Sequence, residues 1–298
     1  MCHKEFISIL ISVSVIYLRG DVRGLEAEPI IGGNDAPPNA FPYHVSILRR
    51  RTMRSICGGA IIGDRYVLTA GHCVASANGT MYDLSLIVLS GVTSFDSYPK
   101  TRSEIPVEKV FIPVMYKQQF LLNKSGDIAV LRLVRSFNYK DAHWSPLELP
   151  AERSDFTNRI ATVTGFGWNT IVITNPSKGN YTEDGESYGK LRYAPVKVLD
   201  NFVCNTFFLG RALSPKRFCG QMIQEQPNKL AGVCTGDSGG ALVIQRRIVI
   251  GIASTSPSGC NESHRPGMYT RVSAFVNFIE RCKKDAPDPD IISRTLPV

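Results

Sequence analysis

Short apolar runs separated by turn-forming residues recur along the chain from residue 44 to residue 253. Such runs between Gly, Pro, Asn and Ser are typical of β-strands, and many of them in series favour a sandwich or a barrel. Only residues 272–282 repeat their apolar side chains at helical spacing. The sequence therefore predicts an all-β protein with one helix near its end. The clearest predicted strands cover residues 44–48, 66–70, 84–89, 128–133, 160–164, 196–199, 242–244 and 248–253.

Three segments depart from this pattern. Residues 6–18 form an apolar run that is too short for a helix crossing a bilayer about 30 Å thick. We interpret residues 1–24 as a secretory signal peptide and residues 25–29 as a short propeptide, with an uncleaved signal anchor as the alternative. Residues 169–190 are polar and rich in Gly and Ser, which predicts a long exposed loop. Residues 283–298, with two Pro among Asp residues, predict a flexible tail.

Charge and cysteine content narrow the classes of function. The formal net charge is +8, but the basic residues are scattered and only residues 49–51 form a compact run, so binding to nucleic acid is not predicted. Of eight Cys, Cys2 lies in the predicted signal, and the other seven contain no Cys-x-x-Cys pair. This usage favours a disulfide framework in an oxidising compartment over a zinc or thioredoxin-like site. Because seven is odd, one thiol is left over.

The most informative motif is Gly236-Asp237-Ser238-Gly239-Gly240. A nucleophilic serine needs a tight turn that presents its hydroxyl, and glycines allow both the turn and the close approach of a substrate carbonyl. The backbone N–H groups of Gly236 and Ser238 would then bind the developing oxyanion, where one donor is typically worth about 10²–10³ in rate. The alternative is an ordinary glycine-rich loop.

A serine hydroxyl also needs a base, and the base needs an acid that holds its tautomer. His72 follows a predicted strand, and the neighbouring Cys73 could join its turn to Cys57. Asp127 stands at the start of an apolar strand, where a carboxylate is unfavourable unless it is paired. Surface or core positions are the ordinary interpretation of the remaining histidines considered, His44, His143 and His264. An ordinary turn aspartate remains the alternative for Asp127.

The order His72, Asp127, Ser238, with Ile30-Ile31-Gly32-Gly33 upstream, resembles the chymotrypsin–trypsin family of serine proteases. The resemblance covers residues 30–282. It implies two six-stranded antiparallel β-barrels, about residues 30–150 and 151–282, with a C-terminal α-helix and with the three residues as a catalytic triad in the cleft between the barrels.

The resemblance also implies disulfides and an activation step. The family disulfides map onto Cys57–Cys73, Cys204–Cys219 and Cys234–Cys260, which leaves Cys282 as a buried free thiol or as the site of a covalent partner. In the family, cleavage before the residue equivalent to Ile30 frees an amine that pairs with the equivalent of Asp237. Here Pro29 precedes Ile30 where a basic residue is usual. We therefore expect another processing route, such as stepwise removal of the dipeptides Glu26-Ala27 and Glu28-Pro29.

The specificity pocket implied by the family has an uncharged floor in this chain. The floor falls on Gly232, followed by the apolar Val233, and the walls fall on Ser254, Ser256 and Gly267. A buried arginine side chain would have no counter-charge there, so we expect cleavage after large apolar residues. Ser256, at a position where glycine is common, narrows the pocket mouth and leaves an elastase-like preference for smaller residues as the alternative.

The sequence also predicts sites of modification and bears on metal binding. Sequons for N-glycosylation begin at Asn78, Asn123, Asn180 and Asn261. No metal is expected, because Val92 after Gly91 does not continue the family's calcium loop, and no cofactor is implied.

Together these observations predict a secreted, monomeric serine endopeptidase, made as a zymogen, with protein or peptide substrates and protein inhibitors, and with no membrane contact after signal removal. The alternative from another class is a non-cleaving homologue that acts as a binding protein. A lipase or esterase of the α/β-hydrolase type is disfavoured, since its triad runs Ser, Asp, His.

Overall fold

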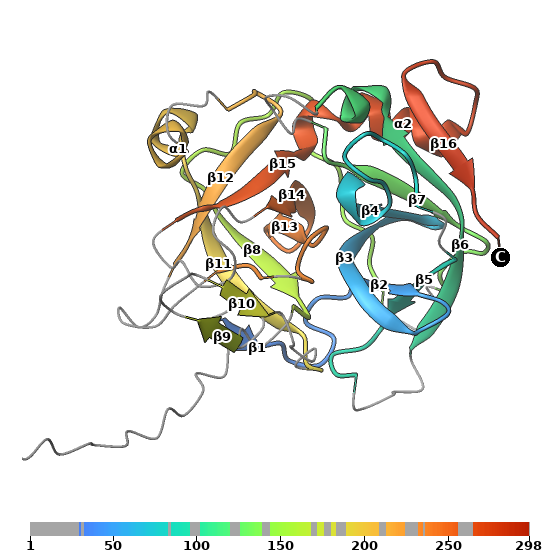
Figure 1. The fold of residues 1–298 in the computed structure, drawn as a ribbon, viewed down its shortest axis with the longest axis horizontal. Coiled ribbons are helices and arrows are strands. Elements are labelled where there is room, and N and C mark those ends of the chain that lie inside the picture. Colours follow the sequence, from blue (N-terminus) through green and yellow to red (C-terminus); the bar gives the residue numbers. More distant parts are fainter. Residues whose placement is uncertain are drawn as a thin grey trace, which may run out of the picture.

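The computed structural model describes most of the chain after residue 29 (Figure 1). The described residues are 30, 33–82, 85–95, 102–119, 126–138, 144–167, 172–175, 180–182, 189–208, 213–223, 232–234, 236–255 and 265–297. The predicted signal peptide, residues 1–24, and the propeptide, residues 25–29, lie outside this set.

The first barrel consists of six antiparallel strands closed by pairing between β6 and β7. Its inward side chains form one apolar core; in β6, for example, burial alternates along the strand before becoming continuous where β16 covers it. This is the expected pattern for a strand with one face toward a core. The strands are β2 (His44–Arg49), β3 (Arg54–Gly63), β4 (Tyr66–Thr69), β5 (Leu86–Ser90), β6 (Ser103–Pro113) and β7 (Ala129–Leu133).

The second barrel repeats this architecture and is closed by pairing between β8 and β11. In Figure 1 it lies beside the first barrel. Its strands are β8 (Ile160–Gly165), β11 (Arg192–Val198), β12 (Arg217–Met222), β13 (Ala241–Ile244), β14 (Ile248–Thr255) and β15 (Gly267–Arg271). Strand β13 begins three residues after Ser238 in the sequence. The prediction of two closed six-stranded antiparallel barrels is confirmed.

Two further strands exchange between the barrels. Strand β1 (Asn34–Asp35), which precedes the first barrel, pairs with β11 of the second. Strand β16 (Ile291–Thr295), which follows the second barrel, pairs over five residues with β6 of the first. The prediction of a flexible tail over residues 283–298 was therefore wrong for its described part. Local composition pointed to disorder, whereas the open edge of β6 offers hydrogen bonds and the apolar core admits Leu296, which is 4% exposed.

The helices are few and short. The expected C-terminal helix is present as a 3₁₀ turn, η4 (Val272–Ala274), followed by α2 (Val276–Lys284). Helix α1 (Asn201–Phe207) was not predicted, although the Asp200 side chain accepts a hydrogen bond from Phe202 N (2.7 Å) as an N-cap does. Two 3₁₀ segments, η1 (Gly71–Cys73) and η2 (Val114–Gln119), flank the first-barrel strands, and the predicted loop over residues 169–190 contains the paired strands β9 (Val172–Asn175) and β10 (Asn180–Thr182). No helix in the described residues is long and apolar enough to cross a membrane.

Candidate active site

The Ser238 turn is fixed against both barrels by backbone hydrogen bonds. Gly58 N in β3 donates to Ser238 O (2.8 Å), and Gly239 N donates to Ala253 O in β14 (2.8 Å). Gly239 has a φ of 81°, and a Cβ there would lie 2.2 Å from Thr69 Oγ1. Only glycine satisfies this conformation and this close approach together, so the motif places the serine directly against the strand that precedes His72.

The Asp127 carboxylate holds His72 through two hydrogen bonds. His72 N donates to Asp127 Oδ1 (2.9 Å), and His72 Nδ1 lies 2.9 Å from Asp127 Oδ2. With Nδ1–H directed at the carboxylate, the other ring nitrogen, Nε2, is the one that can accept a proton. The His72 side chain is 36% exposed whereas that of Asp127 is 4% exposed, so the imidazole stands at the surface and the acid lies behind it.

Two hydroxyls from the second barrel complete the surroundings of Asp127. Ser254 Oγ donates to Asp127 Oδ2 (2.5 Å), and Thr270 Oγ1 donates to Asp127 O (2.7 Å). Burial alone would raise the pKa of Asp127, but the hydrogen bonds and charge of His72 and the Ser254 hydroxyl outweigh it and lower the pKa. Sequence reasoning assigned Ser254 only to a pocket wall and missed Thr270, because nothing local in either strand marks a partner far away in the sequence.

A disulfide links the histidine turn to the strand that contacts the serine. Cys57 and Cys73 are bonded, as expected, and they adjoin Gly58 and His72 in the sequence. Gly58 binds the Ser238 carbonyl, so His72 and Ser238 are joined by a path of one disulfide and one hydrogen bond. His72, Cys57 and Cys73 also lie close enough to suggest a metal site, but sulfurs in a disulfide are not thiolate ligands.

The expected oxyanion donors are the N–H groups of Gly236 and Ser238. Gly236 has a φ of 94°, which favours glycine. In the part of the chain that the structure describes, neither N–H donates a hydrogen bond to the protein. Two backbone donors without a protein acceptor beside a serine can stabilise an anionic oxygen.

Asp237 is fully buried and faces Ile30. Its carboxylate accepts hydrogen bonds from Gly167 N (2.9 Å), Cys234 N (2.8 Å) and Ile30 N. Burial raises the pKa of Asp237 to about 6, against the opposing effect of these three N–H groups. A Cβ on Gly165 would lie 1.9 Å from Asp237 Oδ1, so glycine there leaves room for the carboxylate. The structure thus brings together the two residues that the sequence predicted as an activation pair.

The described part of the expected specificity pocket is uncharged. Gly232 is half-buried and Val233 is buried. A Cβ on Gly267 would lie 3.3 Å from Val233 Cγ2, so the predicted wall and the residue beside the predicted floor are close in space. Ser256 lies outside the described residues. Ser254 turns its hydroxyl toward Asp127, so its side chain supports the acid, leaving only its backbone for the pocket wall.

The other predicted residues divide between described and undescribed positions. The disulfide Cys204–Cys219 is present, and Cys234 is disulfide-bonded while its expected partner Cys260 lies outside the described residues. Cys282 is a buried free thiol, and burial raises its pKa. His44 is buried, with Nδ1 2.9 Å from Thr164 Oγ1, so it occupies the expected core position.

Two of the four predicted glycosylation sequons lie in the described residues and two lie outside them. Asn78 is exposed in the described residues, and its Oδ1 accepts a hydrogen bond from Thr80 N (3.0 Å). Asn180 is the first residue of β10. Asn123 and Asn261 lie outside the described residues.

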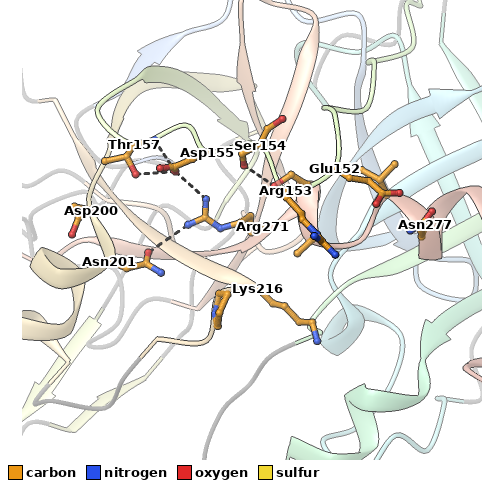
Figure 2. Close-up of a pocket in the computed structure, with 14 residues that line it drawn as sticks. Glu152, Arg153, Ser154, Asp155, Thr157, Asp200, Asn201, Lys216, Arg271 and Asn277 are labelled. Carbon is orange, nitrogen blue, oxygen red and sulfur yellow. Dashed lines mark hydrogen bonds and ion pairs between the residues drawn. The ribbon is translucent and has the colours of Figure 1, made fainter.

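A cavity of about 590 Å³ lies elsewhere on the second barrel and contains none of the predicted triad residues (Figure 2). Arg271 crosses it, with Nη1 3.3 Å from Asp155 Oδ1 and Nη2 3.5 Å from Asn201 Oδ1. We call it the Arg271 cavity.

Comparison with known proteins gives concordant matches. The family model described as Trypsin matches residues 30–279. Coagulation factor XI of Bos taurus is 29% identical over 258 residues, which cover 84% of this chain and 37% of that protein. Kallikrein 1-related peptidase b24 of Mus musculus is 27% identical over 278 residues, which cover 89% of this chain and 96% of that protein. The solved structure of mouse neuropsin, described as a serine protease expressed in the limbic system of the brain, matches with a TM-score of 0.66 and 26% identity over 84% of this chain and 98% of that chain.

Proposed function

This chain belongs to the trypsin family of serine proteases, and on that premise we propose that it is a serine endopeptidase with His72, Asp127 and Ser238 as its triad. The observation that carries the proposal is the Asp127 carboxylate, which bonds both the backbone N–H and Nδ1 of His72 and leaves Nε2 available as a base.

The reaction follows from these positions. Ser238 Oγ attacks the scissile carbonyl carbon while its proton moves to His72 Nε2. The carbonyl oxygen becomes an oxyanion that accepts hydrogen bonds from Gly236 N–H and Ser238 N–H. The C–N bond then breaks, and the leaving amine takes the proton from Nε2, which leaves an ester on Ser238. Water cleaves this ester by the same sequence and releases the acid. Asp127, kept ionised by its lowered pKa, stabilises the imidazolium formed in both halves.

A serine-directed phosphonate probe tests the triad directly. The activated protein should be labelled at Ser238, and Ser238→Ala and His72→Ala should abolish labelling and lower peptide hydrolysis by on the order of 10⁶. A folded, correctly processed chain without labelling or hydrolysis would instead support the alternative, a non-cleaving homologue that binds proteins.

For specificity we propose cleavage after large apolar residues. The support is the absence of charge on Gly232, Val233 and Gly267, which leaves an arginine of the substrate without a partner. Matched chromogenic peptides ending in Phe, Leu, Ala and Arg test it: kcat/KM should be highest for Phe or Leu. A preference for Ala would favour the elastase-like alternative, and a preference for Arg would overturn the apolar pocket.

Activation is proposed to occur by cleavage before Ile30. Ile30 has a φ of 38°, which is strained for a β-branched residue, and its N–H reaches Asp237. Cleavage of the preceding peptide bond removes this torsion and converts the amide into an ammonium that can form an ion pair with the carboxylate. Because Pro29 is not basic, we propose stepwise dipeptide removal. Sequencing the N-terminus of the active protein should give Ile30, and a different start in fully active enzyme would reject this route.

Secretion is proposed from the apolar segment at residues 6–18 together with two disulfides in the described chain. We further propose glycosylation at the exposed Asn78, regulation by protein inhibitors and action as a monomer. Expression in a secreting eukaryotic cell tests the first two: the medium should contain protein whose mass falls on glycosidase treatment, and Asn78→Gln should remove part of that shift. Retention of the protein in the cells would contradict secretion.

A further inference from the structure

Arg217, the first residue of β12, is a buried cation that forms no salt bridge within the part of the chain that the structure describes. It is 6% exposed, and its Nε is buried without a hydrogen bond. Its guanidinium forms no ion pair or hydrogen bond with the described residues. Burying a charge without a salt bridge is unfavourable, and burial lowers the pKa of Arg217 accordingly. Such a residue needs an explanation beyond packing.

The neighbouring Arg271 shows how an arginine is ordinarily accommodated in the same sheet. Its guanidinium bonds to Asp155 and Asn201 in the Arg271 cavity (Figure 2) and lies 5.2 Å from the centre of the Phe218 ring. Arg271 and Arg217 are of the same residue type on paired strands, yet only Arg271 has conventional partners. This difference makes Arg271 a matched control for Arg217.

The strand register directs Arg217 toward the triad acid. Arg217 is paired with Thr270 across β12 and β15, and paired residues of antiparallel strands project from the same face. The Thr270 hydroxyl reaches Asp127 O (2.7 Å), so the Arg217 side chain shares the face that carries Asp127. Asp127 is also the acidic group with which Arg217 interacts electrostatically. Arg271, next along β15, projects to the opposite face.

The other described side chains that contact or interact with the Asp127–His72 pair are neutral hydroxyl groups. From η2, the Tyr116 hydroxyl donates to Ala75 O (3.1 Å), and burial together with Asp127 raises its pKa, so it is neutral. Tyr82 interacts in turn with Tyr116. Ser254 and Thr270 contribute neutral hydroxyls.

Apart from Asp127, the charged residues near Arg217 in the described chain lie on the other side of the sheet. Lys216, Asp155, Asp200 and Arg271 all line the Arg271 cavity.

We propose that Arg217 is a positioning residue that acts through Asp127: its fixed positive charge opposes protonation of His72 and keeps the base available at lower pH. This inference rests on the proposed function. When His72 is neutral, the Arg217 guanidinium and the Asp127 carboxylate are two opposite charges in the low-dielectric interior. Protonating His72 adds a second cation to the same carboxylate. A fixed cation near the same carboxylate makes that second charge less favourable, so protonation of His72 is opposed.

The test compares variants on the activated enzyme. Arg217→Met removes the charge but keeps an apolar stem that suits burial, Arg217→Lys retains the charge, and Arg271→Gln removes a paired charge on the opposite face. For each, kcat/KM of an uncharged peptide is measured from pH 4 to pH 9 and normalised to sites titrated with the phosphonate probe. We expect Arg217→Met to move the acid limb upward by about half to one pH unit, with Arg217→Lys and Arg271→Gln within about 0.2 units of the unmodified enzyme.

The outcomes are separable. If the acid limb of Arg217→Met does not move, or if Arg271→Gln moves it equally, the proposal is wrong. A merely structural role would lower the number of titrated sites or the thermal stability without moving the limb. If Arg217→Met does not fold, Arg217→Gln is measured in its place under the same criterion. Absence of hydrolysis by the unmodified, correctly processed protein would overturn the proposed function and not this assignment alone.

Discussion

The two ends of the described chain cross between the barrels in opposite directions, but they are held in different ways (Figure 1). The N-terminal arm, Ile30 to Asp35, joins the second barrel through the two-residue strand β1 and through the buried Ile30. The C-terminal arm, residues 285–297, joins the first barrel through the five-residue strand β16.

The N-terminal arm depends on one buried ionisable group. Ile30 is fully buried, and its N–H binds Asp237, whose pKa is raised to about 6 by burial. Around β1, Arg192 donates to Gly33 O, and its Nε lies 3.3 Å from Asp35 Oδ1. No buried cation among the described residues is seen to face this carboxyl, so the contact is suited to a new ammonium at Ile30, as the proposed activation step requires.

The C-terminal arm distributes its contacts among groups that are apolar or partly exposed. Leu296 is buried in the first-barrel core, and its N–H donates to Glu108 O (2.9 Å). Asp285 forms ion pairs with Lys109 Nζ (2.7 Å) and with Arg132, and the Asp285 side chain is itself 28% exposed. An arm built in this way closes a sheet edge and responds weakly to any single charge. Under the proposed activation at Ile30, the N-terminal arm is the switching element and the C-terminal arm is the brace.

The largest effect expected is on activity, from the N-terminal arm. Asp237→Asn should lower kcat/KM of the processed enzyme by about 10²–10³, because removing one partner of a buried ion pair typically costs about 3–5 kcal/mol. Asp285→Asn, the matched change in the C-terminal arm, should leave kcat/KM within about twofold. Peptide hydrolysis after N-terminal sequencing measures both. Equal losses in the two variants would remove the distinction between the arms.

The next effect is on the pH dependence of stability in the chain before cleavage. The pKa of Asp237 is about 6 in the folded chain and ordinarily 3.8, so the folded state retains a proton that the unfolded chain has released. The resulting stabilisation is complete below about pH 4 and is lost as pH rises through 6, by about 3 kcal/mol in total.

Urea unfolding of Ser238→Ala between pH 4 and pH 7, with and without Asp237→Asn, measures this contribution. The difference between the two curves isolates Asp237 from other titrating groups. A difference that does not change with pH would contradict the assignment. Protein that begins at Ile30 should show a smaller decline, since its ammonium favours the charged carboxylate.

A smaller effect on stability tests the bracing role of the C-terminal arm. Leu296→Ala should lower the free energy of unfolding by about 2–3 kcal/mol, because a buried leucine is truncated, while kcat per titrated site stays within about twofold. Ile160→Ala is the control, since Ile160 is 63% exposed and should lose less than about 0.5 kcal/mol. Thermal or urea unfolding suffices. An unchanged midpoint in Leu296→Ala would show that β16 does not brace the barrel in solution.

The smallest effect concerns the ion pairs of the C-terminal arm. Lys109→Gln should destabilise the protein by at most about 1 kcal/mol, since the Lys109–Asp285 pair is partly exposed. The loss should diminish in high salt. Unfolding midpoints at low and high ionic strength measure it. A loss of stability as large as that of Leu296→Ala would show that ion pairs, and not burial, hold the C-terminal arm.

Much of the site was accessible from short motifs. Ser238, His72 and Asp127 each stand in a local pattern that restricts backbone or partner, and the structure places His72 and Asp127 in direct contact. The disulfides Cys57–Cys73 and Cys204–Cys219 followed from a family resemblance, not from geometry, and both are present. Strands with clean apolar runs were identified, whereas longer mixed strands such as β3 and β6 were not.

The sequence by itself indicated a β-sandwich or barrel through its periodicity and supplied the motifs of the candidate triad, and the family resemblance of these motifs implied the two-barrel fold and the uncharged pocket floor. Only the tertiary structure decided that Ser254 and Thr270 support Asp127, that Arg217 shares their face, and that residues 291–295 form a strand. Each of these depends on pairing between segments far apart in the chain. The free energy of such a contact comes from burial and register, and neither leaves a mark in the local sequence.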